Sequence, residues 1–353
     1  MQTVLSRPTT DKGQGLKPSE VVMKKSAEAD PHAEQDRVIR ECLGNEEKLK
    51  SLNDTMARTI ATEVYDLSLA RALLLPHLCY GGGYSPVYQE TDAGPVVMVD
   101  LVRTEERVLH CRAFRDSLCE EETVRTRQDI RYLTVRGKAR PSSFTLSCVC
   151  TAKRTELGQR PYAIVERARQ HLLRSLAQDE TRVMLRALAW VCSRFGTLRW
   201  CVRPQASLLR LLGEAVQRSG MHRSPVILCS PLAFARILNL RIARLASDPS
   251  QDRPSQPIAA IEVEGQTIPV YVNQSIPNHL FYVIPSGAAL GQMPIFSEVK
   301  VENYDRRERL IKGWQLWQGQ GMVFVRPRST NVVYFGWRGL LAAVKSLLGW
   351  GNS

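Results

Sequence analysis

The sequence predicts an α+β fold in which helical segments and strand segments occupy separate stretches of the chain. Three observations predict it. Before residue 75 and again from residue 161, apolar residues recur every three to four positions, as they do in amphipathic helices. Between residues 95 and 160 and after residue 225 they alternate or form short runs, which is typical of strands. With 353 residues, 44% of them hydrophobic, the chain can bury one large core or two moderate ones.

The composition indicates the kind of partner and compartment. The net charge of +13 favours a polyanionic partner, most commonly nucleic acid, although a soluble protein that is merely basic is the alternative. Nine cysteines are scattered through apolar runs, so we expect buried thiols in a reducing compartment rather than a secreted disulfide framework. The N-terminus lacks the apolar core of a signal peptide, and no run of about 18 apolar residues predicts a membrane span.

The N-terminal quarter of the chain divides into an arm and a helical segment. Residues 1–33 are rich in Ser, Thr, Lys, Pro and Gly without periodicity, which predicts an arm that is disordered in isolation. From about Ala33 to Leu75 we expect helix, broken at Gly44-Asn45 and ended by Pro76. The apolar residues of this helical segment share a three- to four-residue spacing: Leu49, Leu52, Met56, Ile60 and Val64.

A triple glycine, Gly81–Gly83, follows the helical segment. It lacks the Lys-Ser/Thr of a phosphate-binding loop and does not join a strand to a helix, so we expect a flexible loop or tight turn. Strands are predicted at Pro95–Val102 and Arg107–Phe114.

Residues 115–160 predict a long, exposed, two-stranded β arm. One strand is marked by Ile130, Tyr132 and Thr134, the other by Phe144, Leu146, Cys148 and Cys150, with the turn at Gly137–Ser143. A lone hairpin is marginally stable in water, so we expect this arm to lie on a neighbouring subunit. Cys148-x-Cys150 lacks a second pair at zinc spacing, which favours two buried thiols over a metal. The residues expected in an inter-subunit loop are Arg136, Gly137, Lys138 and Arg140.

The clearest helix is predicted from Pro161 to residue 195. Proline in the first turn and Gly196 after the end are the expected punctuation. Residues 161–223 contain 11 Lys/Arg and four Asp/Glu, which favours a row facing nucleic acid over a solvated polar face of mixed sign. The candidate DNA-facing residues are Arg167, Arg174, Arg182 and Arg186.

The last third of the chain predicts a compact mixed sheet with helices and no catalytic motif. An amphipathic helix ends at Gly220, and the module runs from Pro225 to Phe335, closed by an antiparallel pair of strands in MVFVRP and NVVYF. Residues 338–353 predict a short amphipathic helix that docks on its own or a neighbouring subunit, with a membrane-surface helix as the alternative.

The order of these elements, together with SPVILCSPLAFARIL, IEVEGQTIPVYVN and Arg326-Pro327, resembles the major capsid protein of tailed bacteriophages, which has the Hong Kong 97-type fold and is related to encapsulins. The resemblance covers about residues 95–337. It implies the following parts: an N-terminal arm with a helical segment, 1–75; a peripheral domain with a spine helix, 76–114, 161–204 and 296–337; an extended β-hairpin loop, 115–160; an axial sheet domain, 205–295; and a C-terminal tail, 338–353.

The resemblance also implies a function. We expect a structural protein, without catalytic residues, cofactor or metal, that forms hexamers and pentamers of an icosahedral shell around double-stranded DNA. Assembly in the host bacterial cytoplasm, location in the virion and portal, scaffold or cement partners are further expectations. The first alternative is an encapsulin-like compartment with protein cargo. The second is a nucleic-acid-binding or processing enzyme, which would need clustered acidic residues for metal-assisted phosphoryl chemistry.

Overall fold

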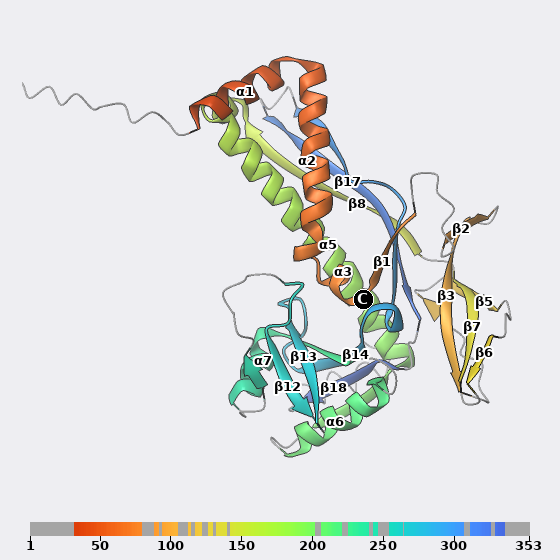
Figure 1. Ribbon diagram of the computed structural model, residues 1–353. Coiled ribbons are helices and arrows are strands. Elements are labelled where there is room, and N and C mark those ends of the chain that lie inside the picture. Colours follow the sequence, from red (N-terminus) through yellow and green to blue (C-terminus); the bar gives the residue numbers. More distant parts are fainter. Residues whose placement is uncertain are drawn as a thin grey trace, which may run out of the picture.

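A computed structural model of the protein describes residues 32–79, 88–91, 94–104, 112–113, 117–121, 126–129, 132–139, 142–201, 206–220, 225–239, 243–245, 254–263, 265–306, 311–325 and 329–335. Between residues 88 and 143 only the backbone is described. Helices cover one face of a sheet in the upper part of Figure 1, and a second sheet with its own helices forms the lower part. The protein has an α+β fold, as predicted.

Three helices begin the described chain: α1 (Ala33–Gly44), α2 (Glu46–Leu67) and α3 (Leu69–Leu73). The predicted break is confirmed, because the side chain of Asn45 caps α2 by accepting hydrogen bonds from the backbone N–H groups of Glu47 and Lys48. The helical prediction up to Pro76 is wrong at its end. Residues Leu75–Leu78 form strand β1, which pairs in parallel with β15 (Gly291–Ile295). Proline fits a sheet edge, whereas it cannot continue a helix.

The upper sheet has five strands, and β17 (Ile311–Phe324) lies at its centre. One edge of β17 pairs with β8 (Ser142–Lys153). Its other edge pairs first with β16 (Lys300–Arg306) and then with β15, beside which β1 lies. Helices α2 and α5 (Pro161–Phe195) pack on this sheet.

The predicted two-stranded β arm is wrong. Strand β7 (Tyr132–Ala139) pairs with β3 (Gly94–Thr104), whereas β8 pairs with β17, so the two strands belong to different sheets. The physical reason is burial: Leu146 and Cys148 lie in one hydrophobic cluster with apolar residues of α5, which an exposed hairpin could not provide. The predicted turn is too long, since Gly137 lies within β7 and Ser143 within β8; residues 140–141, between the two strands, lie outside the described residues.

The sheet that contains β7 has six strands, including β2 (Tyr88–Thr91), β5 (Ser117–Glu121), β4 (Arg112–Ala113) and β6 (Thr126–Asp129). The prediction of a strand at Pro95–Val102 is confirmed by β3. Of the strand predicted at Arg107–Phe114, only Arg112–Ala113 lies in the described backbone. The triple glycine, residues 1–31 and the tail 338–353 lie outside the described residues.

The long helix is confirmed. After the short helix α4 (Arg154–Gln159), α5 runs for 35 residues, about 52 Å, with Pro161 in its first turn. The apolar residues that recur along this helix are buried, except for half-buried Val183: Ile164, Val165, Ala168, Leu172, Leu176, Ala187, Leu188 and Val191. Gly196 follows the helix where a Cβ atom would lie 2.6 Å from the carbonyl oxygen of Cys192, so this position requires glycine.

The lower sheet has seven strands in the order β11 (Ala243–Leu245), β12 (Ala259–Val263), β13 (Gln266–Val272), β10 (Pro225–Cys229), β14 (Leu280–Pro285), β18 (Asn331–Phe335) and β9 (Thr197–Cys201). Helices α6 (Ala206–Gly220) and α7 (Pro231–Asn239) accompany it. Gly265, with a φ of 78°, lies in the turn between β12 and β13, in a region that favours glycine.

Two boundaries differ from the predictions. Strands β17 and β18 do not form the expected closing pair, because β17 lies in the upper sheet and β18 lies between β14 and β9 in the lower one. Residues 197–201 and 331–335, expected in the peripheral domain, therefore belong to the lower sheet, whereas β15 belongs to the upper. Val332 and Val333 are both buried, so β18 is covered on both faces, as a central strand should be.

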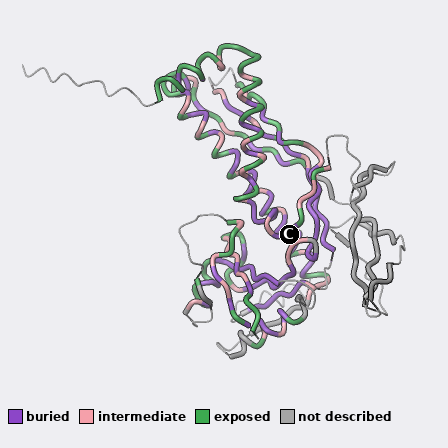
Figure 2. Tube along the Cα trace, in the orientation of Figure 1, coloured by how far each residue is buried: buried purple, intermediate pink, exposed green. Residues whose placement is uncertain are grey.

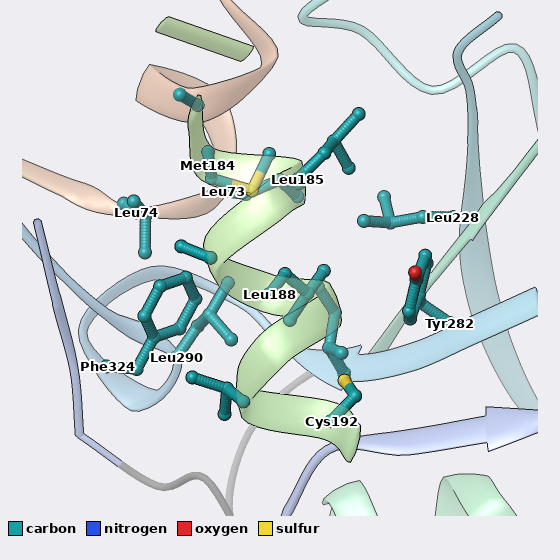
Figure 3. Close-up of a cluster of buried hydrophobic side chains, with 14 of the residues drawn as sticks. Leu73, Leu74, Met184, Leu185, Leu188, Cys192, Leu228, Tyr282, Leu290 and Phe324 are labelled. Atoms are coloured by element: carbon teal, nitrogen blue, oxygen red, sulfur yellow. The ribbon is translucent and has the colours of Figure 1, made fainter. Parts of the chain in front are cut away.

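The C-terminal half of α5 joins the two sheets. One buried cluster contains Phe324 from the upper sheet, Tyr282 from the lower sheet, and Met184, Leu188 and Cys192 of this helix (Figure 3). Figure 2 shows buried and exposed residues alternating along the helices of the upper part, as expected for helices with one side packed on the sheet. Each fully buried leucine contributes about 1.5–3 kcal/mol, so the cluster is a major source of cohesion between the sheets.

Candidate functional site

All four candidate DNA-facing residues lie on α5. All four arginines, Arg167, Arg174, Arg182 and Arg186, are exposed, and we call their surface the arginine face. They are seven, eight and four residues apart, so at about 100° per residue they fall within roughly a third of the helix circumference. The opposite side of the helix is buried against the upper sheet and α2.

Two of these arginines are paired with acidic residues. Arg182 contacts Asp179 one turn before it, with 2.6 Å between nitrogen and oxygen, and Arg167 lies 3.8 Å from Glu156 of α4. Within the described part of the chain, Arg174 and Arg186 have no ion pair. Arg174 and Arg186 therefore have the least compensated charges of the arginine face.

Arg169, on another side of α5, has a structural role. Its guanidinium donates hydrogen bonds to Glu166 and to Glu63 of α2, and its side chain is only 20% exposed. The hydrogen bonds from Arg169 lower the pKa of the Glu166 carboxyl, and those to Glu166 raise the pKa of Arg169 further. Arg169 thus ties α5 to α2.

The residues expected in an inter-subunit loop lie elsewhere. Arg136, Gly137 and Lys138 belong to β7, where their backbones pair with Asp100, Val99 and Met98 of β3. Arg140 lies outside the described residues. These three residues therefore lie in a strand and not in the expected turn. Their contact with another subunit remains a prediction.

A buried ion pair that the sequence did not predict lies where α3, α5 and β17 meet. Arg71 donates to Glu180 through Nε, at 3.0 Å, and through a terminal nitrogen, at 2.6 Å. The same terminal nitrogen donates to Gln318 Oε1 at 3.0 Å. Both ionic side chains are almost completely buried, and the guanidinium also lies 4.6 Å from the centroid of the Tyr65 ring. The only signal in the sequence is the placement of Arg71 and Glu180 among apolar positions of their helices.

A groove of about 1040 Å³ lies between α2 and β16 and adjoins a second hollow of about 410 Å³ beside β1. We call it the α2–β16 groove. Its buried lining residues are Asn53, Ala57, Val299 and Val301. Its exposed charged residues are Glu46, Glu47, Asp54, Glu298 and Glu302 on the acidic side, and Lys50, Arg58 and Lys300 on the basic side.

The cysteines whose side chains the structure describes are free thiols: Cys42, Cys79, Cys148, Cys150, Cys192 and Cys229. Burial raises the pKa of Cys148, Cys192 and Cys229 to about 12, with a further contribution at Cys148 from the nearby Asp179 carboxylate. The residues described contain no group of three His, Cys, Asp or Glu that could hold a metal ion. None of the described helices combines the length and apolar character that a membrane crossing requires.

These surfaces favour binding of charged macromolecules. Exposed guanidinium groups can bind phosphates of a polyanion, and the groove can bind an extended segment that carries apolar and basic side chains.

No protein-family model and no curated protein matches the sequence. Solved structures do resemble it. A virus-like particle from Pyrococcus furiosus is 10% identical over 79% of this chain and 98% of its own, with a TM-score of 0.46. A Mycobacterium phage Adephagia structure is 11% identical over 76% and 90%, with a TM-score of 0.45. The bacteriophage PhiM1 mature capsid is 9% identical over 76% and 87%, with a TM-score of 0.42.

Proposed function

We propose that this chain is the major capsid protein of a tailed bacteriophage and assembles into hexamers and pentamers of an icosahedral shell around double-stranded DNA. The assignment to capsid proteins rests on the order of helices and strands that the sequence predicts. The observation that carries self-assembly is the open edge of β8. Among the described residues this twelve-residue strand pairs only with β17, and its other edge has no partner strand.

Long regular strand edges are aggregation hazards unless another chain or a loop covers them. On the face of the sheet away from α5, Val149 and Trp317 are 39% and 36% exposed on adjacent strands, which adds apolar area beside this edge. A repeated contact with further copies would cover both features. We therefore assign the upper sheet with α5 to a peripheral domain and the lower sheet to an axial domain of one shell subunit.

The arginine face supports DNA as the content of the shell. Its exposed cations suit a phosphate backbone, whereas a compartment with protein cargo has no evident need for them. Portal, scaffold or cement partners and assembly in a bacterial cytoplasm belong to the same proposal.

The content of the particle tests this proposal. The full chain is expressed in bacteria, and large particles are isolated on a density gradient, treated with nuclease and analysed for nucleic acid and for other proteins. The proposal predicts nuclease-protected double-stranded DNA. Small uniform particles with a co-purifying enzyme would favour the encapsulin-like alternative. A stable monomer with metal-dependent nuclease activity would contradict both shell functions.

A further inference from the structure

We infer that a small, neutral and mainly apolar molecule with one carbonyl oxygen binds in the hollow beside β1, which we call the β1 hollow. Its volume of about 410 Å³ is within the range of small-molecule sites, and it adjoins the α2–β16 groove. Its lining comes from α2, α3, β1, β15, β17 and the segment before β16. Figure 1 shows the end of α2, α3 and the start of β1 close together at this place.

Apolar side chains make up most of the lining. Ile295 and Val299 are buried, with 1% and 6% of their surface exposed. Tyr65 and Leu78 stay 40% and 56% exposed, although both are large and apolar. Exposed apolar side chains around a concave surface are typical of a binding site, so the body of the ligand is apolar.

Two buried polar side chains in the hollow have unused hydrogen-bond donors. The Arg71 side chain is 2% exposed and Gln318 is 3% exposed. Nε and Nη2 of Arg71 donate to Glu180, and Nη2 also donates to Oε1 of Gln318. Within the described part of the chain, Nη1 of Arg71 and Nε2 of Gln318 have no hydrogen-bond partner. Each of these nitrogens carries two N–H groups, and buried donors are nearly always satisfied, so the ligand supplies an acceptor.

The charge at this place decides which kind of acceptor fits. The buried Glu180 carboxylate already neutralises the Arg71 guanidinium. A carboxylate or phosphate bound to Nη1 would therefore be a second anion beside Glu180, in an interior that solvates it poorly. A carbonyl oxygen accepts two hydrogen bonds without adding a charge. The polar end of the ligand is therefore the carbonyl group of a ketone, ester or amide.

A molecule in the β1 hollow would link the N-terminal helices to the upper sheet. It would contact α2 and α3 on one side, and β1, β15 and β17 on the other. Because it binds the folded chain only, it should raise the Tm of the subunit. None of these contacts requires a second copy, so the inference does not depend on the proposed shell.

Ligand-observed ¹⁹F NMR titrations of the full chain test the chemistry of the site. The probes are p-fluoroacetophenone, p-fluoroethylbenzene, which has nearly the same shape without the carbonyl, and p-fluorobenzoate, which carries a charge. We expect the ketone to bind about threefold to tenfold tighter than the hydrocarbon, and the benzoate to bind more weakly than the ketone. Equal affinities of ketone and hydrocarbon, tighter binding of the benzoate, or no saturable binding of the ketone would overturn the inference.

A pair of threonine variants on α2 tests the location of the site. Thr55 and Thr62 are both exposed and each donates to the carbonyl oxygen four residues earlier, but only Thr62 lines the hollow. Thr62→Phe should narrow the hollow and lower the affinity for p-fluoroacetophenone several-fold, whereas Thr55→Phe should leave it unchanged. Equal affinities of the two variants would show that the ketone binds elsewhere.

A pair of glutamine variants on β17 tests the donors. Gln318→Met keeps the size of the side chain and removes its amide, so the preference for the ketone over the hydrocarbon should fall. Gln320, two residues later, is also fully buried, and its amide has no hydrogen-bond partner among the described residues. Gln320→Met is therefore the matched control and should keep the preference. An unchanged preference in Gln318→Met, or the same loss in both variants, would contradict a carbonyl group at the base of the hollow.

Discussion

At the scale of single residues, the ion pair between Arg71 and Glu180 fixes the junction of α3, α5 and β17. Both charges lie in the interior, so each depends on the other for compensation, and Arg71 also donates to the side-chain oxygen of Gln318. Such a pair contributes little net stability relative to an apolar pair, but loss of one partner leaves an uncompensated buried charge.

Glu180→Gln should therefore lower the free energy of unfolding by about 3–5 kcal/mol, measured by urea denaturation. The double variant R71M/E180M should recover most of this loss, although Gln318 then loses its donor. An effect below about 1 kcal/mol for Glu180→Gln would show that the pair is open to water in solution.

The buried thiols give a second prediction at this scale. The pKa of Cys192 and Cys229 is about 12 in the folded chain, whereas the ordinary value is 9.0. At pH 8 these thiols should resist iodoacetamide until the protein is unfolded, as measured by peptide mass spectrometry. Because the folded-state pKa is raised, their contribution to stability is complete below pH 9 and is lost as the pH rises from about 9 toward 12. Rapid alkylation of Cys192 in the native protein would contradict the packing.

At the scale of elements, α5 has two different halves. Its first half packs against α2 and the upper sheet, whereas its second half packs between the two sheets, and the arginine face extends over both halves. Arg167 and Arg182 already have acidic neighbours. Arg174 and Arg186 are therefore better candidates for contact with phosphate.

Neutralisation of the free pair should weaken DNA binding more than neutralisation of the other pair. For R174Q/R186Q, the slope of log affinity against log salt for a duplex should fall by about 2, since each phosphate contact contributes about 0.9. R167Q/R182Q is the matched control with the same change of net charge. Anisotropy titrations at several salt concentrations measure both slopes. Equal slopes for the two variants would mean that only net charge matters.

The sequence predicted the elements better than their partners. The period of α5 runs without interruption and its ends have Pro161 and Gly196, so local rules suffice for this helix. Strand β8 alternates as predicted, but its partner β17 lies more than 150 residues later, and no local pattern indicates that pairing. The ion pair of Arg71 could not be predicted either, because its partner Glu180 is 109 residues away in the sequence. The four arginines of the candidate site share one face because a single helix positions them all.

At the scale of the whole molecule, one hydrophobic cluster spans both sheets, with Leu188 fully buried inside it. Leu188→Ala should lower the free energy of unfolding by about 2–5 kcal/mol. Hydrogen exchange should then accelerate in strands of both sheets. Leu212→Ala, in the separate cluster of α6, is the control and should affect mainly the lower sheet. Acceleration confined to one sheet in the Leu188 variant would mean that the halves open independently.

We propose that this chain builds a closed shell through contacts that its isolated fold leaves open. Cryo-electron microscopy of the purified full-length protein tests it most directly. We predict closed particles with five-fold and six-fold clusters of subunits, in which another copy covers the outer edge of β8. Protein that stays monomeric at high concentration, or particles in which the β8 edge faces solvent, would contradict the account.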